Sequence, residues 1–206
     1  MAEVLERVPT IFQVHEEFDM SSAKDFHNEF AGQIYHELKT QLQGTEYVAK
    51  FDIFRYLDDW QINSFGDFKN MIQVENFVAG LKRFGAAKRF IKHKLDEFAG
   101  MGTASGTYAP DVFVTEKAER HNEFHVPLLV IEILSQHSRE NDLHFKPYFY
   151  ETIGVQEYFI GEAGVETGTL IKGYRRVEER YQPLPLEKEG YFSEVLNFAL
   201  PREWTF

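Results

Sequence analysis

Cysteine is absent from the 206-residue sequence. Its absence excludes disulfide bonds and thiolate metal sites, and it fits a protein of the reducing cytoplasm. No apolar stretch approaches the length that spans a membrane, and the first residues lack the basic-then-apolar order of a signal peptide. We therefore expect a cytoplasmic protein with no membrane partner.

Basic residues are outnumbered: the chain has 22 Lys and Arg against 33 Asp and Glu, a net charge of −11. This balance disfavours broad, non-specific attraction to nucleic acid but leaves room for a local basic face. Aromatic residues are plentiful, with 20 Phe and 10 Tyr. A chain of this length can bury a substantial core, and we predict one domain spanning residues 1–206.

An apolar run at residues 127–134 organises the chain. Its aliphatic, β-branched composition on both alternating faces predicts a strand that is covered on both sides. One carboxylate, Glu132, lies inside this run. An ionised carboxylate is costly there unless it is paired, hydrogen-bonded or bound to a metal. The alternative is that Glu132 lies near the strand end and points to water.

The pattern along the chain predicts helices first and then strand–strand–helix–strand–strand, a mixed β-sheet with helices on both faces. A capping signal at residues 22–25 opens a helix to about Gln43, and helical spacing returns over residues 67–98, where Gly80 and Gly85 are candidate interruptions. Residues 45–66 fit no single pattern. The remaining predicted elements are strands at 111–115 and 156–161 beside that at 127–134, a helix ending at Ile153 before Gly154, a hairpin within 168–183 and a closing strand or turn at 190–201.

Residues 82–94 carry six Lys or Arg and no acid. Such a run is most often a solvated outer face. In an otherwise acidic protein it is also the best candidate for a surface that faces phosphates. On this hypothesis Lys82, Arg89 and Lys92 contact nucleic acid.

Two acids, Asp111 and Glu132, lie on strands that we expect to be adjacent, and Lys146 follows on the next helix. Adjacent strands are about 4.8 Å apart, so the two carboxylates could share one hard cation. A divalent ion lowers the pKa of bound water and neutralises charge that builds on a phosphate. A lysine beside it can orient the attacking water.

Other polar residues near this motif have ordinary interpretations. Asp142 and Lys146 could be only a surface i,i+4 pair, and Tyr150 is more typical of a core residue. Four histidines match no standard spacing of metal ligands and are interpreted as surface or loop residues: His121, His125, His137 and His144.

Pro110-Asp111 followed by Glu132 resembles the motif of the PD-(D/E)XK nuclease superfamily, which has a restriction-endonuclease-like fold of α/β (α+β) class. One branch, the Uma-type endonucleases long grouped as a domain of unknown function, is similar over about residues 108–200, and His27-Asn28 echoes the start of its first helix. The segments that carry this likeness are Pro110-Asp111-Val, residues 127–135, Asp142-x-x-x-Lys146-x-x-x-Tyr150 and Gly154-Val-x-Glu157-Tyr158.

The resemblance implies a metal-dependent endodeoxyribonuclease that acts on DNA, commonly as a homodimer. Asp111 and Glu132 would bind Mg²⁺ or Mn²⁺, the Ile133 carbonyl would be a further ligand, and Lys146 would position or activate the water. Leu134 stands where the superfamily's usual Glu-x-Lys has its lysine, and in this branch that lysine comes from the following helix.

Two features depart from the family pattern. Pro147 directly follows Lys146, so it either starts the helix there or kinks it. Residues 45–100 have no counterpart in the branch and are predicted to be a mainly helical insertion. The alternatives are a restriction-like fold kept as a nucleic-acid-binding or protein-interaction module, and a nuclease that acts on RNA.

Overall fold

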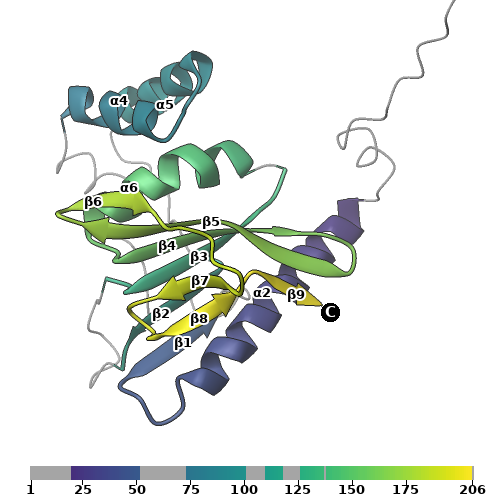
Figure 1. Ribbon diagram of the computed structural model, residues 1–206. Helices are drawn as coiled ribbons and strands as arrows, with labels where there is room; N and C mark the ends of the chain where they lie inside the picture. Colours follow the sequence, from purple (N-terminus) through teal and green to yellow (C-terminus); the bar gives the residue numbers. More distant parts are fainter. Residues whose placement is uncertain (1–19, 52–72, 101–109, 118–125, 137, 206) are drawn as a thin grey trace, which may run out of the picture.

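A seven-stranded mixed sheet forms the middle of the protein (Figure 1). The computed structural model describes residues 20–51, 73–100, 110–117, 126–136 and 138–205. The strands of the sheet run in the order β1-β2-β3-β4-β5-β6, and β9 also pairs with β5. Their bounds are β1 Tyr47–Phe51, β2 Val112–Glu116, β3 Leu129–Leu134, β4 Glu157–Ala163, β5 Thr167–Val177, β6 Arg180–Pro183 and β9 Glu203–Thr205.

The predicted strands at 111–115, 127–134 and 156–161 are neighbours, as β2, β3 and β4. Among the strand pairs of the described residues in this sheet, β3–β4 is parallel and the others are antiparallel. The helical segment between β3 and β4 makes the crossover that a parallel pair requires. The prediction of a mixed sheet in which these three strands are neighbours is confirmed.

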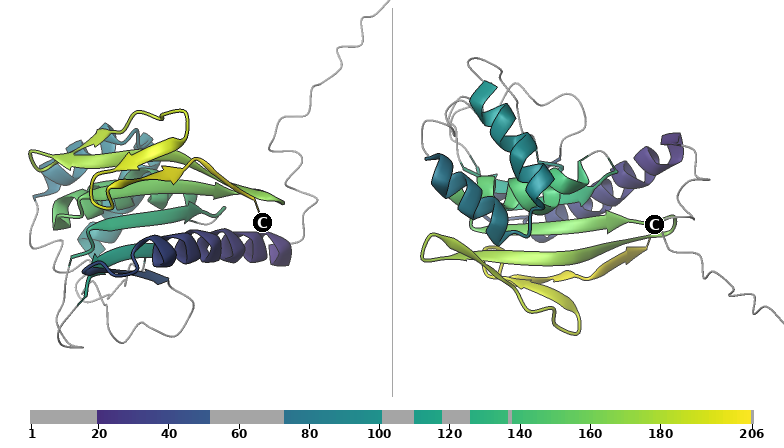
Figure 2. Two further views of the ribbon diagram at one scale, coloured as in Figure 1. Left: turned by 60° about the horizontal axis from the view of Figure 1, so that its bottom comes forward. Right: turned by 90° about the horizontal axis from the view of Figure 1, so that it is seen from above.

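Helices and a hairpin cover the two faces of the sheet. The helices α4 (Val74–Arg83), α5 (Lys88–Gly100) and α6 (Lys146–Ile153) pack on one face. The other face is covered by α2 (Met20–Gln41) and by the hairpin of β7 (Gly190–Ser193) and β8 (Phe198–Pro201). Figure 2 shows α4, α5 and α6 on the side of the sheet opposite the β7–β8 hairpin. No described helix is both long and apolar enough to cross a membrane.

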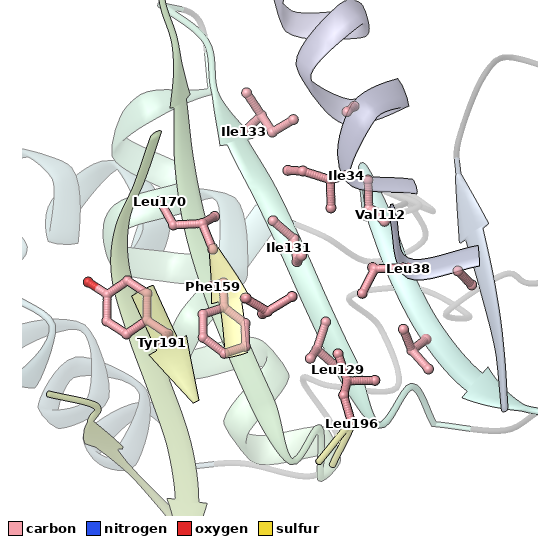
Figure 3. Close-up of a cluster of buried hydrophobic side chains, with 14 of the residues drawn as sticks. Ile34, Leu38, Val112, Leu129, Ile131, Ile133, Phe159, Leu170, Tyr191 and Leu196 are labelled. Carbon is pink, nitrogen blue, oxygen red and sulfur yellow. The ribbon is translucent and has the colours of Figure 1, made fainter. Parts of the chain in front are cut away.

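Side chains of β3 alternate between two buried clusters. Leu129, Ile131 and Ile133 point into the cluster beneath α2, where Figure 3 shows them beside Ile34 and Leu38. Val130 and Leu134 point into the opposite cluster, which includes residues of α6. Because the side-chain period of a strand is two, Glu132 shares the direction of Val130 and Leu134, toward α6.

The first predicted helix is confirmed as α2. Its buried stripe contains Phe30, Ile34 and Leu38, all fully buried against the sheet, at the spacing that puts side chains on one helical face. Gly44 follows the helix with φ +82°, a conformation that favours glycine. The chain then enters β1, which pairs with β2 and gives residues 47–51, ambiguous in sequence, a defined strand.

The helical segment after β3 widens into a π-helical turn, η2 (Asn141–Phe145), and continues directly as α6. Pro147 lies at the start of α6. In a regular α-helix its ring would collide with the carbonyl four residues earlier, and that residue, Leu143, lies within the wider turn. Gly154 ends α6 in the left-handed conformation, as predicted.

The two glycines of the basic region have different roles. Gly85, with φ +82°, lies between α4 and α5 and interrupts the helical run, as predicted. The same prediction for Gly80 is wrong, because α4 passes through it without a break. A Cβ at Gly80 would lie 2.4 Å from the Tyr148 ring, so this glycine allows α4 to approach α6.

Candidate active site

The register of β2 and β3 brings Asp111 and Glu132 to one place. Val112 pairs with Ile131 and Phe113 with Val130, so one further step in the same register sets Asp111, just before β2, opposite Glu132. Residues opposite each other in an antiparallel pair have Cβ atoms about 4.5–5.5 Å apart. Both acids therefore lie where β2 begins and β3 ends.

Asp111 is held by the backbone of β3 and by α2. The N–H of Ile133 donates to Asp111 Oδ2 at 2.7 Å. His27 Nε2 lies 3.4 Å from the same oxygen and 3.1 Å from the Ile133 carbonyl oxygen. Burial favours the neutral form of Asp111, but the hydrogen bond from His27 and the charge of Lys146 outweigh it, so the pKa is lowered.

Glu132 is 1 % exposed, so the alternative that it points to water is wrong. The Tyr150 hydroxyl donates to Oε1 at 2.7 Å, and Lys146 Nζ lies 2.8 Å from Oε2. Burial, together with the charges of Asp111 and Asp142, outweighs the attraction of Lys146 and raises the pKa of Glu132 well above its ordinary value. Both carboxylate oxygens thus have a partner.

Lys146 joins two buried acids. Its Nζ lies 2.8 Å from Glu132 Oε2 and 2.8 Å from Asp142 Oδ1. Asp142 is itself 1 % exposed, so the interpretation of Asp142 and Lys146 as a surface pair is wrong. Burial lowers the pKa of Lys146, but the charges of Glu132, Asp142 and Asp111 outweigh burial and raise it. Lys146 is therefore an ammonium ion at neutral pH.

Further polar contacts fix Asp142 from two sides. The hydroxyl of Ser138 donates to Asp142 Oδ2. The hydroxyl of Tyr158, on β4, donates to the Asp142 carbonyl at 2.8 Å. These contacts leave the Asp142 carboxylate directed at Lys146.

The cluster has an excess of negative charge. Its buried or half-buried carboxylates are Asp111, Glu132 and Asp142, and its one ammonium is Lys146. With all three carboxylates ionised and His27 neutral, the charges sum to −3 + 1 = −2, which a divalent cation would balance. The neighbouring acids raise the pKa of Lys146, and for Glu132 the charges of Asp111 and Asp142 add to the larger effect of burial.

The residues present fit a hard divalent cation, although Glu132 must turn to reach it. Asp111 Oδ2 and the Ile133 carbonyl are oxygen donors on the same edge, as Mg²⁺ and Mn²⁺ prefer. Among the described residues no three His, Asp or Glu side chains are already grouped to hold an ion, because the Glu132 carboxylate faces Lys146 and Tyr150.

The predicted nucleic-acid residues lie on the outer helices α4 and α5, which Figure 1 shows beyond α6. Lys82, Arg89 and Lys92 are all exposed. The Arg89 side chain is 84 % exposed. Its Nη2 lies 3.3 Å from Oε1 of Glu140, the residue before η2. Lys94 belongs to the same basic run but is buried, and its Nζ lies 2.7 Å from Glu97.

The sequence indicates the roles of two site residues only in part. Tyr150 is buried, as its interpretation as a core residue predicts, but its hydroxyl also holds Glu132. The signal for this second role is the spacing of Asp142, Lys146 and Tyr150, each four positions apart on one helical face, which the family resemblance includes. His27 entered only through the family resemblance. It precedes the buried stripe of α2 by three positions, and a histidine in line with such a stripe is the signal that could have found it.

Of the four histidines interpreted as surface or loop residues, His144 lies in η2. Its Nδ1 is 2.7 Å from the carbonyl oxygen of Phe84, and its ring packs edge-on against Phe90, so it joins the helices rather than the acidic cluster. His121, His125 and His137 lie outside the described residues.

Comparison with known proteins identifies the family of the chain. No curated protein matches it. A family model described as "Uma2: Putative restriction endonuclease" matches residues 91–203, more than half of the 206-residue chain. The match includes Asp111, Glu132, Asp142, Lys146 and the strands from β2 to β8. With this match and a mixed sheet of the expected class, the chain belongs to the Uma2 family, within the PD-(D/E)XK restriction-endonuclease-like superfamily.

Proposed function

We propose that the protein is a divalent-metal-dependent endodeoxyribonuclease that hydrolyses phosphodiester bonds in DNA with Mg²⁺ or Mn²⁺. The observation that carries this proposal is the cluster of three carboxylates around Lys146 at the edge where β2 begins and β3 ends. Such an excess of buried acid is expensive for a protein without a cation to balance it. The Uma2 match supports nuclease activity in general.

Each residue has a separate role in the proposed reaction. Asp111, Glu132 and the Ile133 carbonyl would hold the ion, which supplies positive charge at the scissile phosphate and makes the attacking water more acidic. Lys146 is protonated, so it donates hydrogen bonds that orient the water or the phosphate rather than removing a proton. Asp142 and Tyr150 position Lys146 and Glu132.

DNA would approach over the helices α4 and α5. Lys82, Arg89 and Lys92 are exposed on these helices, and the Arg89–Glu140 contact ties α5 to the segment that leads into Asp142 and Lys146. Cleavage of both strands of a duplex in one binding event would use two such sites, which a homodimer would supply.

Nicking of supercoiled plasmid with Mg²⁺ or Mn²⁺ tests the proposal. Wild type should nick the plasmid only with the ion, and Asp111→Ala should abolish nicking. Glu116→Ala, which removes an exposed acid from the other end of β2, is the matched control and should cleave normally. Wild type that never cleaves DNA, with either ion, contradicts the proposal.

A second candidate is a binding module that keeps the fold without cleavage. The observation in its favour is that Glu132 faces Lys146 and Tyr150 rather than an open coordination position. Ion binding separates the two functions, because a nuclease must bind the ion at Asp111 and Glu132 whereas a binding module need not. DNA binding that is unaffected by divalent ions, in a protein that never nicks, would favour this candidate.

A further inference from the structure

We propose that His27 is a metal ligand through Nε2, and that the site therefore takes a first-row transition-metal ion such as Co²⁺ more tightly than Mg²⁺. This inference rests on the proposed metal-dependent function and names the chemistry of its ion. His27 lies on α2, outside the region that matches the Uma2 family.

The two contacts of His27 have the separations expected between neighbouring ligand atoms of one ion. Nε2 is 3.1 Å from the Ile133 carbonyl oxygen and 3.4 Å from Asp111 Oδ2. Around an ion with bonds of about 2.0–2.6 Å, two neighbouring ligand atoms at right angles are about 2.8–3.7 Å apart. Both distances fall in this range, so Nε2 is spaced from each of the two oxygens as neighbouring ligands of one ion are.

The protonation of the three atoms agrees with this arrangement. A carbonyl oxygen and a carboxylate oxygen only accept hydrogen bonds, so Nε2 must carry a proton that points at both. An ion would take the place of that proton and be held by the same lone pairs.

The fold fixes His27 at this position. The buried residues Phe30 and Ile34 continue its side of α2 and anchor the helix on β3. The imidazole itself keeps a side-chain exposure of 22 %, so solvent and small ions can reach it. The site therefore offers an ion one rigid, partly accessible nitrogen ligand and two oxygen ligands.

An imidazole ligand changes which ions the site prefers. Oxygen donors suit Mg²⁺ and Ca²⁺, whereas imidazole nitrogen suits transition metals, whose affinities rise from Mn²⁺ through Co²⁺ to Ni²⁺. A purely structural His27 would instead only donate a hydrogen bond that clips α2 to β3. The amide of glutamine can keep that hydrogen bond, but glutamine is a poor transition-metal ligand.

Calorimetric titration of the chelator-treated protein with Co²⁺, Mn²⁺ and Mg²⁺ tests the assignment. His27→Gln and His27→Ala should each weaken Co²⁺ binding at least tenfold, because loss of even an indirect support of a metal costs about 10–100-fold in affinity. Mg²⁺ binding should change less in His27→Gln. His36→Ala, which removes an exposed histidine from the same helix, should bind every ion as wild type. The visible spectrum of bound Co²⁺ should shift in His27→Gln as a nitrogen ligand is lost.

Asp111→Asn separates failure of this inference from failure of the proposed function. Loss of ion binding in Asp111→Asn, with Co²⁺ affinity and spectrum unchanged in both His27 variants, overturns the role of His27 and leaves the metal site intact. Unchanged binding of every ion in Asp111→Asn places the ion elsewhere and overturns both. Melting temperatures in EDTA verify that His27→Gln, which retains an N–H donor, is folded in these titrations.

Discussion

Glu132 lies at the centre of the polar cluster, with one oxygen on the Tyr150 hydroxyl and the other on the Lys146 ammonium. A buried group with two partners becomes expensive when one of them is removed, because the remaining group keeps its desolvation cost without its bond. Substitutions of the partners therefore measure how the carboxylate is held, separately from what it binds.

Tyr150→Phe should lower the free energy of unfolding by about 1–3 kcal/mol, the cost of leaving one buried carboxylate oxygen without its donor. Urea titration in EDTA measures the change. Tyr35→Phe, which removes a hydroxyl from a partly exposed ring of α2, should leave stability nearly unaltered. Equal stability of Tyr150→Phe and wild type would mean that the hydroxyl contributes nothing to holding Glu132.

Lys146→Ala should cost about 3–5 kcal/mol of stability, because it leaves Glu132 and Asp142 buried without their counter-charge. A surface i,i+4 pair would contribute only about 0.3–0.5 kcal/mol, so the burial of this pair is the reason for the larger expected effect. The variant should also lose DNA cleavage by about 10²–10³-fold. Thermal melts and plasmid nicking measure the two effects, with the exposed Lys92→Ala as control for folding.

Stability of Glu132→Gln relative to wild type should depend on pH. The folded protein raises the pKa of Glu132 well above 4.5, so the folded state holds this proton more tightly than the unfolded chain. The stability that this tighter proton binding gives the folded state is fully present below pH 4.5, and it is lost as the pH rises through the raised pKa of Glu132. In EDTA, the free energy of unfolding of Glu132→Gln should therefore rise relative to that of wild type as the pH rises from 4.5. Urea titrations at the same pH values should show no such trend for Glu166→Gln, which changes an exposed residue in the turn between β4 and β5.

Helix α6 is the element that assembles the site, and α4 packs on it at a glycine. The stretch from η2 into α6 carries Asp142, Lys146 and Tyr150 to the β3 face, and its outer side receives α4 at Gly80. The Tyr148 ring occupies the space where a Cβ of residue 80 would lie. Close approach of this kind makes the pairing of the two helices sensitive to one methyl group.

Gly80→Ala should destabilise the protein by about 1–3 kcal/mol, because its methyl group would overlap the Tyr148 ring. Gly32→Ala is the matched control, since its Cβ would meet only Phe51 at 4.0 Å. Alanine is the better helix former by about 0.5–1 kcal/mol, so Gly32→Ala should be neutral or stabilising. Chemical denaturation of the two variants measures the difference, and equal effects would show that the α4–α6 contact can relax.

Local periodicity accounts for the elements that could be predicted from the sequence. The strand at residues 127–134 is a continuous aliphatic run and the buried residues of α2 recur every four positions, and a linear sequence displays both patterns directly. The pairing of residue 27 with residue 133 spans 106 positions, and no local pattern encodes it. The burial of Asp142 and Lys146 also required the fold, because an i,i+4 acid–base pair looks the same on a surface helix.

At the scale of the whole molecule, charge is unevenly distributed. The chain carries a net charge of −11, yet α4 and α5 place Lys82, Arg89 and Lys92 on exposed positions. A protein with this net charge repels phosphates overall, so its association with DNA would depend on the local basic face of α4 and α5. Arg89 already contacts Glu140, so DNA would compete with this weak, exposed pair.

The triple variant Lys82→Ala, Arg89→Ala, Lys92→Ala should bind DNA with a smaller dependence on salt. Each phosphate contact contributes about 0.9 to the slope of log affinity against log salt, so three contacts should lower it by about 2.7. Fluorescence anisotropy over a series of salt concentrations, in an Asp111→Ala background that prevents cleavage, measures the slope. Alanine at Lys39, Lys172 and Lys188 removes the same charge from exposed positions on other elements, and it should leave the slope near that of the parent. If both triple variants shift the slope equally, total charge rather than the α4–α5 face governs binding.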